Sequence, residues 1–276
     1  MPPVSTITSY KEMVDYASAH GIQNLETLNI LDLSTPDLQK AKELKAYADS
    51  KGISFPCVSV GLSLVDEDRK DAVETVKRYA DIAKILGSPY LHHTIALNFS
   101  EPQKIADNFE VYYQRGIEAV RKIFDYAATL GIRTIYEDQG FLFNGCKNFS
   151  RFLQEVDRNV GVVADFGNIQ FVDEHVEDFI SKFSDRIVHV HAKDYIVTNG
   201  TSREILPGEY TSKGGNYLQG CLIGEGSVHT EDAFKALQAI GYKGFVALEG
   251  DPIGPDEEAS FRENLEIVTG YIHQYL

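Results

Sequence analysis

Four short segments in the second half of the chain end in residue types that bind metal ions. They are TIYEDQG, VVADFGN, VHVHAKD and VALEGDP, which supply Glu137, Asp165, His191 and Glu249. Three carboxylates crowded together away from water repel one another, and a shared cation relieves that repulsion. One imidazole with three carboxylates suits a borderline-to-hard ion. The pattern predicts one divalent metal ion, and among Mn²⁺, Mg²⁺, Co²⁺ and Zn²⁺ we choose Mn²⁺.

Repeating strand and helix units would have to position these four residues. Each follows a short apolar run, and Glu137, Asp165 and His191 are 28 and 26 residues apart, which fits successive βα units. Alternation along a strand gives Glu137 the same face as Ile135 and Asp165 the same face as Val163. The side chains would therefore point into a barrel and meet at the C-terminal ends of its strands.

The whole chain alternates between helical and strand-like patterns. Apolar residues recur at helical spacing in residues 10–20, 36–51, 66–86, 105–130, 148–156, 176–183, 231–240 and 256–275. Strands are predicted at residues 22–28, 53–60, 90–97, 132–137, 161–165, 187–191 and 245–249. Only residues 4–8 could supply an opening strand, so we expect that strand to be short or irregular.

These patterns predict one (β/α)₈ barrel over residues 1–276, a usual length for this fold. Gly21, Gly52, Gly87, Gly131 and Gly241 each precede an apolar run, as glycines that end helices do. Residues 195–221, rich in Gly, Ser, Asn and Thr, predict a long loop after the seventh strand. That loop, with Tyr210 and Tyr217, could act as a lid or as a subunit contact.

Composition excludes several classes of protein. A formal charge of −15 with no basic cluster argues against nucleic-acid binding. No apolar run is long enough to cross a bilayer, and residues 1–10 lack the features of a secretory signal. The three cysteines form no motif, so we expect a cytoplasmic protein. Barrels of this kind often form homo-oligomers, which is an expectation from the fold alone.

The strand-end segments described above resemble those of the xylose isomerase-like barrels. This family includes sugar phosphate isomerases, ketose 3-epimerases, hydroxypyruvate isomerases and inosose-processing enzymes. The resemblance covers most of the chain and is most specific in DRIVHVHAKD and GEGSVHTEDAFKALQAIGYKGFVALEGD. It implies that Glu137, Asp165, Glu249 and the second histidine of HVH, His191, bind the metal ion. His189 also faces inward, but His191 lies nearer the C-terminal end of the strand.

The resemblance also implies an activity. The substrate would be a sugar, cyclitol or small hydroxy-carbonyl compound that chelates the ion, with Glu137 and Glu249 transferring a proton as acid and base. For substrate binding we select four residues on neighbouring strand ends, namely His92, His93, Asn168 and Lys193. Each could equally serve in packing or in an ion pair. The expected function is a metal-dependent isomerase or epimerase.

Three positions depart from the family pattern. Asn168 stands where many relatives carry a histidine, and Phe143 and Val197 replace the second glutamate and the arginine of ketose 3-epimerases. An amide can hydrogen-bond a hydroxyl but cannot shuttle a proton as imidazole does. Free ketohexose 3-epimerisation is therefore disfavoured relative to isomerisation or to dehydration of a keto-cyclitol. The same barrel could also be a non-catalytic sugar-binding protein, or less readily a related apurinic endonuclease.

Overall fold

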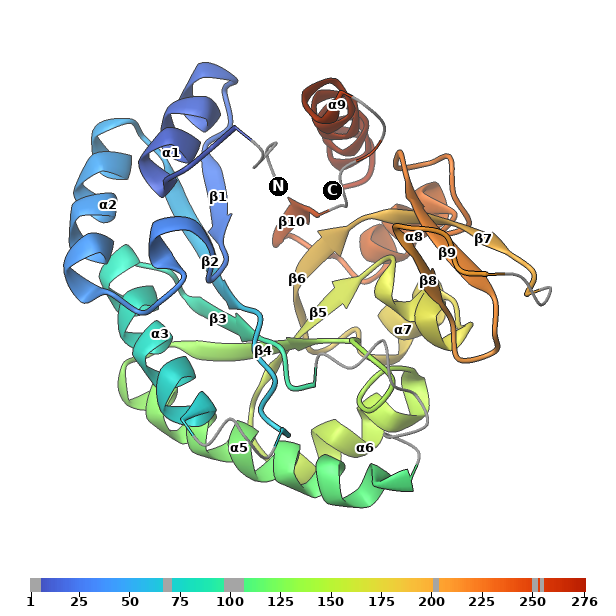
Figure 1. Ribbon diagram of the computed structural model, residues 1–276. Coiled ribbons are helices and arrows are strands. Elements are labelled where there is room, and N and C mark those ends of the chain that lie inside the picture. The colour runs from blue at the N-terminus through green and yellow to red at the C-terminus, as the bar shows by residue number, and fades with distance from the viewer. Residues whose placement is uncertain (1–5, 67–70, 97–106, 201–203, 250–252, 254–255) are drawn as a thin grey trace.

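The computed structural model describes residues 6–66, 71–96, 107–200, 204–249, 253 and 256–276. Seven strands of this part of the chain form one parallel sheet, and its edges are β1 (Asn24–Thr27) and β10 (Phe245–Leu248). Between them, in order, lie β2 (Ser54–Val60), β3 (Tyr90–His93), β4 (Arg133–Glu137), β5 (Gly161–Asp165) and β6 (Ile187–Ala192). The sheet curls so that β10 comes round to face β1 (Figure 1). The predicted (β/α)₈ barrel is confirmed.

The sequence predicted a short or irregular opening strand within residues 4–8. Residues 4 and 5 fall outside the described part of the chain, and residues 6–8 adopt turn and coil rather than strand. Because the sheet pairs β1 with β2 and β10 with β6, these two edges meet without a described strand hydrogen-bonded between them. Among the described residues, the weakest strand pattern of the sequence therefore forms no strand.

Helices cover the outside of the sheet (Figure 1). They are α1 (Tyr10–Ala19), α2 (Leu38–Ser50), α3 (Ala72–Leu86), α5 (Phe109–Thr129), α6 (Cys146–Val156), α7 (Val176–Lys182), α8 (Thr230–Ala239) and α9 (Glu257–Tyr275). Short 3₁₀ helices lie at η1 (Leu31–Leu33) and η2 (Asn168–Val172). Each of the eight predicted helical segments is confirmed over most of its length. Most of their ends differ from the predicted ones by one or two positions, as helix ends commonly do. Of the helices predicted from residues 66 and 105, residues 67–70 and 105–106 lie outside the described part of the chain.

The inward faces of the long helices follow the predicted spacing. On α3, Val76, Ala80, Ala83 and Leu86 are buried against the sheet. On α5, Tyr113 is fully buried, whereas the neighbouring Tyr112 is only partly buried. The five glycines predicted to end helices all have positive φ angles between 69° and 75°. At such angles a side chain is strained, which explains why glycine stands there.

Residues 195–221 were expected to be a long loop, and this prediction is wrong. They contribute to a three-stranded antiparallel sheet of β7 (Asp194–Thr198), β8 (Glu209–Thr211) and β9 (Tyr217–Cys221), in the order β7-β9-β8. Glycine and polar residues are concentrated in its turns, while Tyr195 and Tyr210 pack their rings on Phe171. The composition of the turns therefore concealed the strands. None of the described helices is long and apolar enough to span a membrane.

Candidate metal centre

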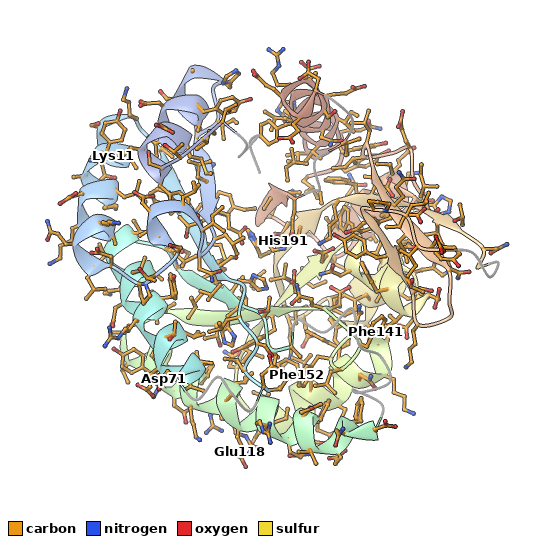
Figure 2. All side chains as sticks on the ribbon, in the orientation of Figure 1. Lys11, Asp71, Glu118, Phe141, Phe152 and His191 are labelled. Atoms are coloured by element: carbon orange, nitrogen blue, oxygen red, sulfur yellow. The ribbon has the colours of Figure 1, made fainter. Side chains whose placement is uncertain are left out.

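Parallel strands bring the four predicted ligands together at one end of the barrel. Glu137 ends β4 and Asp165 ends β5, His191 lies in β6, and Glu249 directly follows β10. Asp165 and Ala247 are the register partners of His191 on its two neighbouring strands. One possible ligand atom from each of the four side chains lies within 4.8 Å of those from the others. His191 lies at the centre of the ring of strands (Figure 2).

The Nδ1 atom of His191 is the point on which the carboxylates converge. It lies 2.9 Å from Glu249 Oε2, 3.1 Å from Glu137 Oε2 and 3.8 Å from Asp165 Oδ2. Glu137, Asp165 and His191 are buried, whereas the Glu249 side chain is 43 % exposed. The site is therefore accessible to solvent beside Glu249.

Two basic side chains lie among these acids and offset part of their negative charge. Burial alone would lower the pKa of His191, but Glu26, Glu249, Asp165 and Glu137 raise it well above the ordinary value. Lys193 Nζ lies 2.9 Å from Asp165 Oδ2 and 3.2 Å from Glu249 Oε1. Burial by itself would raise the pKa of Glu249, but the nearby charges of Lys193 and His191 lower it. The site thus attracts positive charge, and its donor set of one imidazole and three carboxylates fits a divalent ion.

Local backbone structure fixes Asp165. Its Oδ1 atom accepts hydrogen bonds from the backbone N–H groups of Gly167 at 2.9 Å and Asn168 at 2.8 Å. Asp138 Oδ1 accepts from the backbone N–H of Asp165 at 3.1 Å. A Cβ atom at Gly167 would lie 2.6 Å from the side chain of Lys193, so the glycine of the DFGN segment leaves room for the lysine. The turn that fixes Asp165 therefore also leaves space for Lys193 to pair with it.

The predicted substrate-binding histidines point in opposite directions. The His92 ring lies 5.3 Å from the ring of His191, and its Nε2 is 3.6 Å from Glu137 Oε1. That nitrogen is buried and has no hydrogen-bond partner among the described residues. His93 instead uses Nδ1 with the Thr94 carbonyl, at 3.1 Å, and Nε2 with the Tyr136 hydroxyl, at 2.8 Å. Successive strand residues face opposite sides, so only His92 borders the four ligands.

The other two predicted substrate-binding residues adjoin Asp165. Lys193 pairs with its carboxylate, as described above, and the backbone of Asn168 donates to it. The buried side-chain amide nitrogen of Asn168 has no hydrogen-bond partner within the part of the chain that the structure describes. An amide donor held near the site without a partner could bind a substrate oxygen.

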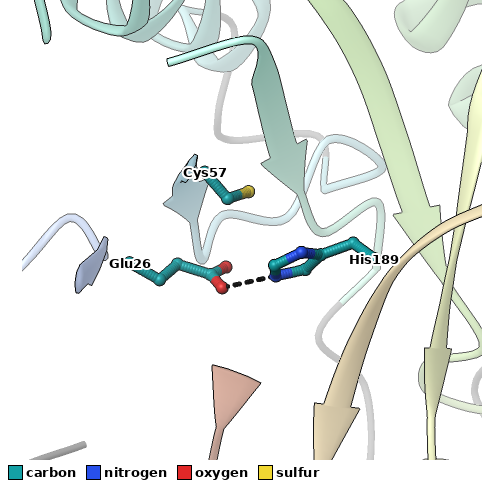
Figure 3. Close-up of side chains that lie close together, drawn as sticks. All are labelled: Glu26, Cys57 and His189. Carbon is teal, nitrogen blue, oxygen red and sulfur yellow. Dashed lines mark hydrogen bonds and ion pairs between the residues drawn. The ribbon is translucent and has the colours of Figure 1, made fainter. Parts of the chain in front are cut away.

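Sequence reasoning missed Glu26, which comes from the first strand of the sheet. Its carboxylate lies 3.2 Å from His191 Nε2 and 2.8 Å from His189 Nε2 (Figure 3), and Ser59 donates a hydroxyl hydrogen bond to it. Burial alone would raise the pKa of Glu26, but the two histidines hold it well below its ordinary value. The available signal was an acidic residue inside the predicted strand 22–28, between Leu25 and Leu28.

Comparison with known proteins identifies the family. A family model described as "Xylose isomerase-like TIM barrel" matches residues 14–270, and the chain belongs to this family. An inosose dehydratase from Geobacillus thermodenitrificans is 22% identical over 262 residues, covering 91% of this chain and 85% of that protein.

Solved structures show the same fold. A xylose isomerase domain protein from Planctomyces limnophilus superposes with a TM-score of 0.77 at 18% identity, covering 95% of this chain and 93% of that one. A xylose isomerase-like barrel from Mycobacterium smegmatis in complex with magnesium has a TM-score of 0.73 at 16% identity, with 97% and 89% covered. D-psicose 3-epimerase from Clostridium cellulolyticum H10, solved with D-tagatose, has a TM-score of 0.72 at 20% identity, with 96% and 93% covered.

Proposed function

We propose that this barrel is a divalent-metal-dependent isomerase or epimerase that moves a proton next to a carbonyl group. Its substrate would be a sugar, a cyclitol or a small hydroxy-carbonyl compound. The observation that carries the proposal is the approach of Glu137 and Glu249, from separate strands, to the same nitrogen of His191, at 3.1 Å and 2.9 Å. Two carboxylates so placed can serve one substrate as an acid and a base.

A divalent ion held by Glu137, Asp165, His191 and Glu249 would polarise the substrate carbonyl and acidify the neighbouring C–H bond. Manganese is our choice, and the magnesium complex of the Mycobacterium smegmatis relative supports a divalent ion in this family. Asp165, held by two backbone N–H groups, fixes one side of the site. Lys193 keeps a positive charge beside the substrate's oxygen atoms, and His92 and Asn168 offer ring and amide nitrogens to its hydroxyl groups.

The two glutamates complete the proton transfer. One takes the proton from the carbon next to the carbonyl. In an epimerisation, the other returns a proton to the same carbon from the opposite face. In an isomerisation the proton is added to the former carbonyl carbon, and the neighbouring hydroxyl proton moves to the carbonyl oxygen. Atoms and electrons balance in both reactions, so no redox cofactor is required. The structural likeness to D-psicose 3-epimerase supports chemistry of this type.

A second candidate is dehydration of a keto-cyclitol, because curated relatives are named inosose dehydratase. This reaction starts with the same proton abstraction. The second glutamate would then protonate the hydroxyl group on the next carbon, which leaves as water while a carbon–carbon double bond forms. By the family resemblance drawn from the sequence, Asn168 stands where many relatives carry a histidine, and an amide in place of an imidazole favours this candidate over 3-epimerisation of a free ketohexose.

Deuterium exchange tests the proposal. The Mn²⁺-reconstituted protein would be incubated in D₂O with ketoses, inososes and hydroxypyruvate, and products would be followed by NMR and mass spectrometry. Isomerisation or epimerisation predicts deuterium at carbon without loss of mass as water, whereas dehydration predicts that loss. Glu137→Gln and Glu249→Gln should abolish both, while Glu43→Gln, on the exposed face of α2, should change neither. Tight sugar binding without exchange in the wild-type protein would instead indicate a non-catalytic barrel.

No nucleic acid or membrane partner enters this proposal. A cytoplasmic location and assembly into a homo-oligomer stay predictions from the sequence.

A further inference from the structure

Both ring nitrogens of His191 face carboxylates, but on opposite sides. Nδ1 faces the three acidic residues of the candidate metal centre, at 2.9 Å from Glu249 and 3.1 Å from Glu137. Nε2 faces Glu26, at 3.2 Å from its Oε1. Glu26 is not one of the four predicted ligands, and it comes from β1, 165 residues away in the sequence. The imidazole therefore lies between a candidate metal site and a separate carboxylate.

With a divalent ion at the candidate metal centre, this arrangement gives the two ring nitrogens of His191 different roles. A neutral imidazole carries one N–H group, and only its other nitrogen has a lone pair for an ion. An ionised carboxylate can only accept a hydrogen bond, so the Nε2–H group of His191 would donate to Glu26. The Nδ1 lone pair is then directed at the ion that Glu137, Asp165 and Glu249 would bind. Metal-binding histidines commonly donate their second ring N–H to such an acceptor, which fixes both the tautomer and the ring orientation.

Glu26 is itself held in place by neighbouring donors. Its Oε2 atom lies 2.8 Å from His189 Nε2, and Ser59 donates its hydroxyl hydrogen to Oε1. Ser59 in turn contacts His92 Nδ1 at 3.0 Å. With both oxygens engaged, the carboxylate cannot rotate freely away from His191. His189 thus holds one oxygen of the Glu26 carboxylate, and Ser59 holds the other.

We propose that Glu26 is a positioning residue that fixes the Nε2–H tautomer of His191 and so directs Nδ1 toward a bound divalent ion. This inference rests on the proposed function, since it requires an ion at the candidate metal centre. Glu26 does not touch the substrate in this arrangement. It acts through His191, with His189 and Ser59 as its supports.

The same region offers two rival groups that include Glu26. One is Glu26 with His92 and His191, which would bind an ion on the Glu26 side of His191 and leave the ring proton on Nδ1. The other lies beside it. Glu26, Cys57 and His189 (Figure 3) each have a possible ligand atom within 4.8 Å of those of the other two, so they could hold a second ion. Cys57 is fully buried beside Ile135 and Val163, and burial raises the pKa of its thiol well above the ordinary value. A protonated thiol among apolar side chains is a poor ligand. We therefore assign Glu26 to His191 rather than to a second ion.

Metal affinity and histidine NMR together test this assignment. Zn²⁺ and Mn²⁺ affinities would be measured by competition with a chelator for the wild type, Glu26→Gln, Glu26→Ala and Ser59→Ala. We expect Glu26→Ala to weaken binding by about 10-fold to 100-fold, the usual effect of losing such a partner. Glu26→Gln should lose less, because its amide oxygen can still accept from Nε2–H. Ser59→Ala should have the smallest effect, since Ser59 does not touch His191.

The position of the ring proton of His191 is a second measurement, and a general loss of packing would not change it. In ¹⁵N-labelled, Zn²⁺-loaded wild-type protein, His191 should carry its proton on Nε2 and none on Nδ1. A proton on Nδ1, or unchanged zinc affinity in folded Glu26→Ala, would overturn the inference. Two bound ions, one of them lost in Cys57→Ala, would replace it with the rival site. A wild-type protein that binds no ion would instead refute the proposed metal centre itself, and the inference with it.

Discussion

Removing the charge of Lys193 should destabilise the metal-free protein far more than the metal-loaded protein. Lys193 Nζ lies 2.9 Å from Asp165 Oδ2 and 3.2 Å from Glu249 Oε1. Asp165 is fully buried, so Lys193→Met leaves an uncompensated buried charge, and breaking a buried pair costs about 3 to 5 kcal/mol. The Glu249 side chain is 43 % exposed, so water screens that pair and it adds little. We expect a loss of about 3 kcal/mol in the free energy of unfolding without metal.

A bound divalent ion would replace much of the missing charge. If the bound ion halves the loss of unfolding free energy in Lys193→Met, the thermodynamic cycle requires the variant to bind the ion more tightly than the wild type. The difference would be about 1.5 kcal/mol, or roughly tenfold in affinity. Urea unfolding in EDTA and in saturating Mn²⁺ would measure the two losses, and titration calorimetry would measure the affinity. Lys235→Met is the matched control, because Lys235 pairs with Glu231 and Asp232 on the surface and should lose under about 1 kcal/mol in either condition. Equal losses for Lys193→Met with and without metal would refute this reasoning.

Three further predictions concern the barrel around the site. Burial lowers the pKa of His93 from 6.5 to about 3, so its contribution to stability is present above pH 6.5 and is lost as the pH falls toward 3. His93→Gln should therefore reduce the fall in unfolding free energy between pH 6.5 and 4.5 by about 2 kcal/mol, and an unchanged slope in pH-dependent urea unfolding would contradict this. Gly161→Ala should cost about 1 to 3 kcal/mol by urea unfolding, because a Cβ would lie 2.8 Å or less from two β-branched side chains. Gly270→Ala, in open space on α9, should be neutral or stabilising, and similar losses for both would exclude the steric cause. The Asp194 carboxylate accepts hydrogen bonds from the backbone N–H groups of residues 224, 226 and 228, so Asp194→Ala should accelerate hydrogen exchange at those amides, and unchanged exchange would contradict that role.

Local patterns account for the parts of the fold that the sequence predicted. The helices carry a 3.6-residue apolar repeat and glycine at their ends, and both signals are contained within one element. The convergence of Glu137, Asp165, His191 and Glu249 required one more rule, that parallel barrel strands share a C-terminal edge. Because that rule is general, strand-end residues could be grouped from the sequence alone.

The remaining features depend on contacts that no local pattern records. Glu26 meets His189 and His191 only because the sheet curls, and these partners are 163 and 165 residues away in the sequence. His92 and His93 are identical as residue types, and only the register of β3 decides which one faces the barrel interior. The strands β7 to β9 were missed because their turns contain the glycine and polar residues that also mark loops.

The most direct test of the central claim is the metal content of the protein and of four single variants. Purified protein would be stripped with a chelator, reconstituted separately with Mn²⁺, Zn²⁺, Co²⁺ and Mg²⁺, and measured by elemental analysis. We predict one divalent ion per chain in the wild type and greatly weakened binding in Glu137→Gln, Asp165→Asn, His191→Ala and Glu249→Gln. Wild-type protein that retains none of these ions, or folded variants that bind as the wild type does, would contradict the four-ligand site.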